Sequence, residues 1–173
     1  AEGVSAADVT DVVFTHLHSD HVGWSVHGDP AAPSPTFPNA RHLVQQIEVT
    51  RIATGTPGQR ALHNSHLRPL VDAGFVETVD GATTPLPRVR LVPTPGHTAG
   101  HQAVALDQPD ATLLISGDVF VHPVQVTDPS VRYTYEDDPA EAIRTRRRVL
   151  ADAAETRTLL ATAHFEARPS CSK

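Results

Sequence analysis

The sequence predicts an α/β fold in a single domain, and three observations point to it. Apolar runs of strand length alternate with segments of helical character along the 173 residues. Several of the predicted strands end in a loop that carries histidine or aspartate. The length suits one domain with a sizeable core, whereas two full domains would each have little core. We therefore interpret residues 1–173 as one domain.

Composition argues against several classes of partner. The net charge of −6, with histidine neutral, argues against a nucleic-acid backbone as the main partner. The sequence contains no run of about 18 apolar residues that would span a membrane. Its single cysteine, Cys171, excludes an intrachain disulfide. We expect a cytoplasmic protein that acts on a small-molecule substrate. Whether the chain forms a homodimer is left open.

The first predicted strand, residues 12–15, leads into the segment that is richest in chemistry. Residues 5–8 have the S-x-x-D form of a short capped turn, and the apolar run that follows suits a strand covered on both faces. Four metal-ligand residues then follow in an H-x-H-x-D-H pattern, namely His16, His18, Asp20 and His21. Imidazole with carboxylate suits zinc or iron, and such a loop is typical of a catalytic metal site. A merely polar surface loop is the alternative, and four ligands at this spacing argue against it.

Proline content and apolar spacing predict the elements up to residue 92. We expect a short helix or turn at 22–24 and then an irregular loop at 27–38, because four prolines interrupt that segment. The loop is either a wall or lid of a pocket or a solvated connection. The later elements are a strand and helix within 41–53, a helix at 59–73 kinked at Pro69, and strands at 75–79 and 88–92.

Three further strand ends each supply a potential ligand. The stiff loop 93–101 presents His97, and of the strands at 102–106 and 112–116 the second ends at Asp118. A helix with Asp138 as its N-cap runs to about Ala154, and a strand at 158–163 then delivers His164. We interpret the helix's basic cluster as a solvated face rather than an anion site; it consists of Arg144, Arg146, Arg147 and Arg148.

The potential ligands divide into two sets and one bridge. One set is His16, His18 and His97; the second is Asp20, His21 and His164; Asp118 is placed to bridge them. Two ions a few ångströms apart hold a water between them and supply hydroxide near neutral pH. The same ions polarise a carbonyl or phosphoryl oxygen of the substrate. We also expect Asp20 to transfer a proton during attack or leaving-group departure.

These motifs resemble the metal motifs of the metallo-β-lactamase-fold hydrolase superfamily. The matching segments are H-x-H-x-D-H, Gly96-His97, Gly117-Asp118 and Ala163-His164, in the right order across residues 12–165. The resemblance implies an αββα sandwich that binds two zinc ions, or alternatively iron or manganese, and hydrolyses ester-like bonds. Members usually have further strands before this first strand, so we expect a partial domain that is truncated at the N-terminus and lacks the first strands. Truncation at the C-terminus stays an open alternative.

Within the superfamily, the chain resembles the branch of methyl parathion hydrolase and related lactonase-like enzymes. Segments 21–24, 35–40 and 123–126 carry this resemblance, as does the arginine-rich helix. One position departs from the lactonase pattern. Many acyl-homoserine-lactone lactonases have a tyrosine three residues after the bridging aspartate, and this chain has Val121 there.

The substrate pocket and the overall function leave more room for alternatives. We expect Trp24 and Phe120 to form an apolar wall and His122 to face the substrate, while His101 either orients a ligand or is structural. The leading hypothesis is a dinuclear metal-dependent hydrolase that cleaves a small ester, lactone or phosphotriester. The alternatives are an iron-dependent oxidoreductase of the same superfamily and an inactive truncated fragment that only binds metal.

Overall fold

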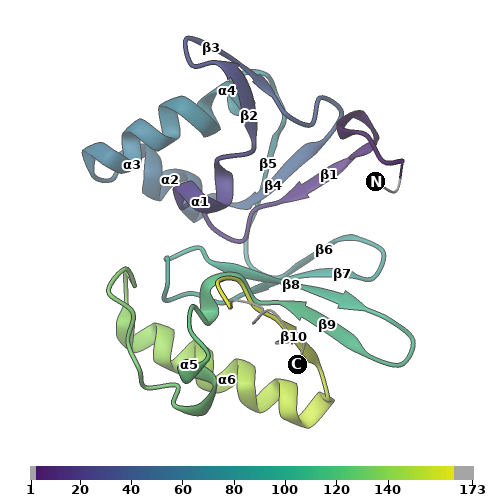
Figure 1. Cartoon of the computed structure of the whole chain (residues 1–173), viewed down its shortest axis with the longest axis vertical. Coiled ribbons are helices and arrows are strands. Elements are labelled where there is room, and N and C mark those ends of the chain that lie inside the picture. Colours follow the sequence, from purple (N-terminus) through teal and green to yellow (C-terminus); the bar gives the residue numbers. More distant parts are fainter. Residues whose placement is uncertain (1–2, 166–173) are drawn as a thin grey trace, which may run out of the picture.

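Two β-sheets face each other, and helices cover the outer side of each (Figure 1). The structure is a computed structural model that describes residues 3–165. One sheet is parallel, with the order β1-β4-β5, and consists of β1 (Asp11–Val13), β4 (Arg41–Gln45) and β5 (Val76–Val79). The other is mixed, with the order β10-β9-β8-β7-β6. Its strands are β6 (Thr83–Leu86), β7 (Val89–Pro93), β8 (Gln102–Asp107), β9 (Thr112–Ile115) and β10 (Leu159–Ala161).

The helices divide between the two sheets. Those on the side of the parallel sheet are α1 (Ser19–Val22), α2 (Gln46–Thr54), α3 (Pro57–Leu62) and α4 (Arg68–Asp72). Those on the side of the mixed sheet are α5 (Val124–Thr127) and α6 (Pro139–Thr156). Single turns complete the list: η1 (Ala6–Asp8), the π-turn η2 (His63–Leu67) and η3 (Gly117–Val119).

Three apolar clusters hold these four layers together. One packs the parallel sheet on its helices around Val44 and Ile52, and the second fills the space between the sheets around Leu43 and Leu91. The third packs the mixed sheet on α6 around Val149. Leu43 and Val44 are neighbours in β4 and point to opposite faces, so both sides of this strand are buried. The layering is the αββα sandwich expected from the sequence.

The proline-rich segment is a hairpin, so the prediction of an irregular loop at 27–38 is wrong. Strands β2 (Val26–Asp29) and β3 (Ala32–Pro35) pair in antiparallel fashion. Pro33 and Pro35 stand two residues apart, so both missing N–H donors fall on the same edge of β3. Within residues 3–165 this ribbon has two strands, and its outer edge tolerates the loss of donors.

The predicted helices form, with one break. Asp138 accepts hydrogen bonds from the N–H groups of Ala140 and Glu141 and so caps α6 as expected. The helix predicted at 59–73 is α3, η2 and α4 in succession, and the wider π-turn comes directly before the turn that contains Pro69. The strands predicted at 75–79 and 88–92 lie in different sheets, with β6 between them.

Arg146 corrects the interpretation of the basic cluster on α6. Its side chain is buried rather than solvated, and it forms an ion pair with the buried Glu136. It also donates hydrogen bonds to the carbonyl oxygens of Pro129 and Val131. Arginine at this position therefore ties α6 to the segment that precedes it, instead of facing water.

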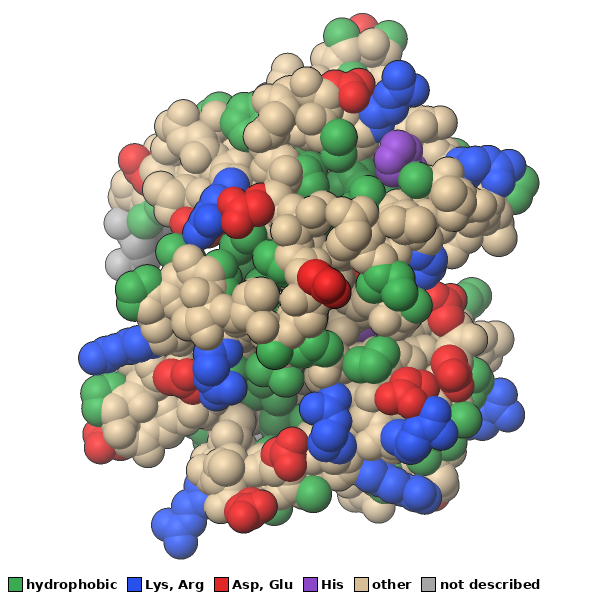
Figure 2. Space-filling view, turned by 180° about the vertical axis from the view of Figure 1, so that it is seen from behind, with side chains coloured by type: hydrophobic (Ala, Val, Ile, Leu, Met, Phe, Trp, Pro, Cys, Tyr) green, Lys and Arg blue, Asp and Glu red, His purple; other side chains and the backbone are tan. Residues whose placement is uncertain are grey.

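The surface and the chain ends complete the description. No helix within residues 3–165 is long and apolar enough to cross a membrane. Figure 2 shows acidic and basic side chains interspersed on the face seen from behind. Cys171 and the segment 166–171 lie outside the described residues, so the interpretation of that cysteine stays a prediction.

Candidate metal centre

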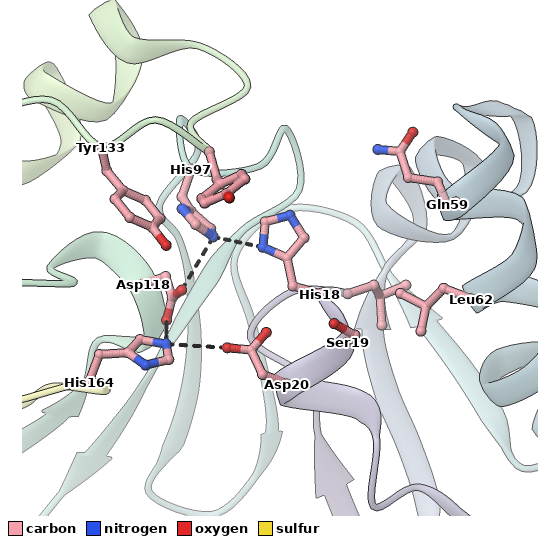
Figure 3. A pocket seen from close by; sticks show the side chains of 12 residues that line it. His18, Ser19, Asp20, Gln59, Leu62, His97, Asp118, Tyr133 and His164 are labelled. Atoms are coloured by element: carbon pink, nitrogen blue, oxygen red, sulfur yellow. Dashed lines mark hydrogen bonds and ion pairs between the residues drawn. The ribbon is translucent and has the colours of Figure 1, made fainter.

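The ends of strands from both sheets bring the seven predicted ligands together. Figure 3 shows those that line the pocket, namely His18, Asp20, His97, Asp118 and His164. His16 and His18 lie in the loop after β1, and Asp20 and His21 lie on α1 directly after it. The mixed sheet supplies the other three: His97 between β7 and β8, Asp118 in η3 after β9, and His164 after β10. The cluster therefore spans the two sheets.

The first set consists of three histidines whose ring nitrogens converge. His18 Nδ1 lies 3.1 Å from His16 Nε2 and 2.9 Å from His97 Nε2. His16 and His97 are buried, and His18 is partly exposed at the edge of the cleft. Burial lowers the pKa of His16 and of His18, and it lowers the pKa of His97 to about 3. These rings are neutral at pH 7, which is the state that binds a metal ion.

The second set lies nearer to solvent and contains Asp20, His21 and His164. His21 Nε2 lies 3.4 Å from Asp20 Oδ2 and 3.3 Å from His164 Nε2. His164 Nε2 lies 3.5 Å from the same carboxylate oxygen. Burial opposes a charge on His21, but the hydrogen bond to Asp118 and the charges of Asp118 and Asp20 outweigh it and raise its pKa.

Asp118 lies between the two sets. Its Oδ2 is 3.3 Å from His97 Nε2 and 3.8 Å from His16 Nε2. Its Oδ1 is 3.2 Å from His21 Nε2 and 3.3 Å from His164 Nε2. The carboxylate of Asp118 thus faces the first set of ligands with one oxygen and the second set with the other.

The donor atoms fit a pair of metal ions. In a tetrahedral site with metal–nitrogen bonds of about 2.0–2.1 Å, neighbouring ligand atoms lie about 3.4 Å apart. The distances within both sets fall close to that value. Imidazole with carboxylate is a donor set for zinc, iron or manganese. The arrangement therefore holds the ligands where two ions would bring them.

His101 contacts Asp118 through the backbone of that residue. It is fully buried, and its Nε2 accepts a hydrogen bond of 3.0 Å from the backbone N–H of Asp118. Its Nδ1 must then carry the proton, which it donates to Thr94 Oγ1 at 2.7 Å. Burial lowers its pKa to about 4, consistent with a neutral ring. The burial of His101 and its contact with Asp118 fit both predicted roles, so the choice between them stays a prediction.

Gly117 allows this close approach. Its φ is +51°, and a Cβ there would lie 2.8 Å from His101 Nε2 and 2.9 Å from Thr15 Cβ. A larger residue would push this segment away from His101 and Thr15 and would disturb the hydrogen bond between Asp118 and His101. The glycine before Asp118 is therefore required by packing as well as by conformation.

A cleft of about 410 Å³ opens over the ligands. The residues that line it include Leu17, Leu62, Tyr133 and Tyr135. Figure 3 shows Leu62 and Tyr133 on opposite sides of the ligands. The Tyr133 ring stacks on His97, with a centroid distance of 6.1 Å and an interplanar angle of 16°. Sequence reasoning missed both tyrosines, and the only signal was that the chain's two tyrosines stand two residues apart.

The residues predicted to bind substrate lie elsewhere. Phe120 is fully buried in the core with Val149, so it is not a wall of the cleft. His122 is exposed outside the cleft, and its Nδ1 accepts a hydrogen bond from the N–H of Val124. Trp24 is 84% exposed and lines an adjoining hollow that shares Asp20 with the cleft, so its role stays a prediction.

Comparison with known proteins gives a consistent result. A family model described as the metallo-beta-lactamase superfamily matches residues 1–164. Probable metallo-hydrolases of Mycobacterium bovis and Mycobacterium tuberculosis are each 31% identical over 126 residues, covering 69% of this chain and 40% of those proteins. The chain thus spans less than half of the length of these relatives.

Solved structures share the fold. The hydrolase AbOPH, described as in the beta lactamase superfamily, superposes with a TM-score of 0.80 at 24% identity and covers 95% of this chain. AidC, a dizinc quorum-quenching lactonase in complex with a product, has a TM-score of 0.84 at 23% identity and covers 96% of this chain. The match spans 60% of each of those chains. At these identities the likeness shows the fold alone.

Proposed function

The chain belongs to the metallo-β-lactamase superfamily, and on that premise we propose that it is a dinuclear metal-dependent hydrolase of a small ester, lactone or phosphotriester. The observation that carries the proposal is the position of Asp118. Its two oxygens face separate groups of histidines at 3.2–3.8 Å. A carboxylate shared in this way is what a two-ion centre requires of its bridging ligand.

The two sets of ligands would each hold one ion. His16, His18 and His97 would hold the first, and Asp20, His21 and His164 the second, with Asp118 between them. When bound, the ions supply Lewis acidity and an activated water at neutral pH. Zinc is the first expectation, since the donor atoms suit it and the structural neighbour AidC is described as a dizinc enzyme. Iron and manganese are the alternatives.

Asp20 is placed for proton transfer. Its carboxylate belongs to the second set and also lines the cleft, and its side chain is 57% exposed. From this position it takes a proton from the attacking nucleophile or returns one to the leaving group. The ligands deeper in the cluster have little access to solvent and are less suited to this task.

The shape and lining of the cleft support a small-molecule substrate. The volume of the cleft suits a small molecule, and its side walls carry apolar and aromatic groups. Figure 3 shows the Tyr133 side chain directed toward Asp118. Burial, then Tyr135 and the charges of Asp118 and Asp20, raise the pKa of Tyr133 and keep its hydroxyl protonated. We propose that this hydroxyl donates a hydrogen bond to a substrate oxygen. Val121, which stands where many lactonases have a tyrosine, has no group that donates one.

Metal content and hydrolysis, measured on the same preparation, test the proposal. We expect about two zinc ions per chain by elemental analysis and turnover of members of an ester, lactone and phosphotriester panel. His18→Ala and Asp118→Ala should each abolish turnover while the circular-dichroism spectrum stays that of the wild type. Turnover that survives either change would rule out the dinuclear mechanism. Bound iron with oxygen uptake would instead favour the oxidoreductase, and absence of bound metal the inactive fragment.

A further inference from the structure

A buried carboxylate lies behind the proposed metal centre and belongs to neither set of ligands. Glu48 is in the first turn of α2 and is fully buried. Burying a carboxylate is costly unless hydrogen bonds and an opposite charge compensate for the lost hydration. The hydrogen-bond and ion-pair partners of Glu48 therefore indicate its role in the structure.

The two oxygens of Glu48 bind the two loops that carry the first set of ligands. Oε2 accepts a hydrogen bond of 3.0 Å from the backbone N–H of Leu17, the residue between His16 and His18. Oε1 accepts one of 2.9 Å from the N–H of Gly100, in the loop that carries His97. One side chain thus joins two loops that come from different sheets.

Arg51 balances the charge and extends the connection. Its guanidinium donates to Glu48 Oε2 at 3.1 Å from the next turn of α2. Another nitrogen of the same group lies 3.4 Å from Asp137 Oδ2. The N–H of Asp137 in turn donates to the carbonyl oxygen of His97 at 3.0 Å. Glu48 and Arg51 therefore both contact the loop of His97, Glu48 through Gly100 and Arg51 through Asp137.

Gly100 is what lets the loop approach α2 so closely. A Cβ at this position would lie 2.4 Å from Ile47 Cγ2, 2.8 Å from Glu48 Cγ and 3.0 Å from Glu48 N. Ile47 is half exposed and can move aside, whereas the helix backbone cannot. A side chain at residue 100 would therefore lift the loop off Glu48.

We propose that Glu48 is a positioning residue that holds the loop of His16 and His18 in register with the loop of His97, so that the three nitrogens converge before a metal ion binds. The inference rests on the proposed function, because it concerns the same centre. Ligands that are held in place bind metal more tightly than ligands that must be ordered first. The 2.9 Å approach of His18 to His97 is the contact that this arrangement maintains.

Glu48→Gln in the full chain is the first test, because it keeps the shape of the side chain. One acceptor oxygen becomes an amide N–H that faces a backbone donor. We expect zinc affinity, measured by competition with a chromogenic chelator, to fall about 10- to 100-fold. The cobalt-loaded variant should also show an altered visible absorption spectrum, which reports the ligand geometry directly.

Glu136→Gln is the matched control. Glu136 is also buried and paired with an arginine, Arg146, but it accepts no hydrogen bond from either ligand loop among the described residues. We expect its zinc affinity and cobalt spectrum to equal those of the wild type, whatever stability it loses. If the two variants lose the same affinity, Glu48 acts only through general stability and the proposal is overturned.

A second measurement needs neither metal nor activity. Hydrogen exchange of the Leu17 and Gly100 amides in the metal-free chain should be faster in Glu48→Gln and unchanged in Glu136→Gln, with Val104 of β8 as internal reference. Unchanged exchange at both amides would overturn the proposal. Should Glu48→Gln not fold, Gly100→Ala separates the loop from Glu48 with both charges kept and must show the same loss of zinc affinity.

The outcomes separate this inference from the proposed function. A wild-type chain that binds no zinc would end the proposed function, and the amide exchange would still decide whether Glu48 joins the loops. A wild-type chain that binds zinc and hydrolyses its substrate, with Glu48→Gln equal to it in affinity, would end only the inference about Glu48.

Discussion

At the scale of single residues, position in the fold decides which polar groups take part in chemistry. Asp118 and Glu48 are both buried carboxylates, yet one faces histidine rings and the other faces backbone N–H groups and an arginine. The first is therefore suited to bind metal and the second to hold loops. The same distinction separates Tyr133, whose side chain lines the cleft, from Phe120, which lies in the core.

Tyr133→Phe tests the tyrosine hydroxyl. The change keeps the ring that stacks on His97 and removes the proposed donor to the substrate. We expect kcat to fall by about 100- to 1,000-fold, because one donor to a developing oxyanion is lost, while zinc content stays the same. Tyr135→Phe is the control, since that side chain is 68% exposed at the rim. An unchanged kcat for Tyr133→Phe would show that the hydroxyl takes no part in turnover.

At the scale of elements, α6 depends on a charge pair as well as on its apolar stripe. Ala142, Val149 and Ala153 are buried on one face of the helix, and Arg146 shares that face. Its guanidinium joins the helix to Glu136 and to the carbonyl oxygens of the segment before it. That segment carries Tyr133, so the helix also helps to place one wall of the cleft.

Arg146→Met tests this role of α6. The change keeps much of the side-chain volume but leaves Glu136 buried without its partner, and we expect the free energy of unfolding to fall by about 3–5 kcal/mol. Urea denaturation followed by circular dichroism gives the value. Arg147→Met, on the exposed side of the helix, should change stability by less than about 0.5 kcal/mol. Equal losses in the two variants would mean that the buried pair adds nothing.

At the scale of the whole molecule, the proposed centre connects the two sheets. The parallel sheet supplies His16, His18, Asp20 and His21, and the mixed sheet supplies His97, Asp118 and His164. Bound ions would therefore join the two halves of the sandwich in addition to the apolar cluster between them. Metal binding and stability should be linked.

Chelation tests this linkage. Removal of zinc from the wild type with a chelator should lower Tm, and readdition of zinc should raise it in a concentration-dependent way, because only the folded chain brings the ligands together. Differential scanning calorimetry measures both steps. Asp118→Ala should show a much smaller response to zinc. A Tm that is indifferent to the chelator in the wild type would contradict the linkage.

The buried histidines also predict a pH dependence of the metal-free chain. Burial lowers the pKa of His97 to about 3 and of His101 to about 4, against an unfolded value of about 6.5. Between these values the unfolded chain binds more protons than the folded chain, so the free energy of unfolding rises with pH. The raised pKa of His21 favours the folded state at lower pH, but this one group is outweighed by the several histidines whose pKa is lowered.

We therefore expect the metal-free chain to be most stable above about pH 7 and to lose stability as the pH falls toward 4. Urea denaturation at pH 7.5, 6 and 5 measures the trend. His101→Gln should flatten part of the slope, since it removes one group whose pKa differs between the two states. A stability that increases as the pH falls over this range would contradict the assignment of neutral buried rings.

Much of the fold and the identity of the candidate ligands were predictable from the sequence. Strand ends and ligand residues are local features: an apolar run followed by H-x-H-x-D-H, or by Gly117-Asp118, indicates both at once. The cap at Asp138 is local in the same way, because its acceptor serves N–H groups two and three residues away. The αββα layers followed from the resemblance that these motifs carried.

Only the tertiary structure decided the surroundings of the centre. The contact of Glu48 with Leu17 and Gly100, the burial of Arg146 and Phe120, and the place of Tyr133 over His97 all join segments that are distant in sequence. Periodicity reports which side of an element is apolar, but it carries no information on which segment covers that side. How deep a side chain lies and what it contacts depend on how the two sheets and their helices pack.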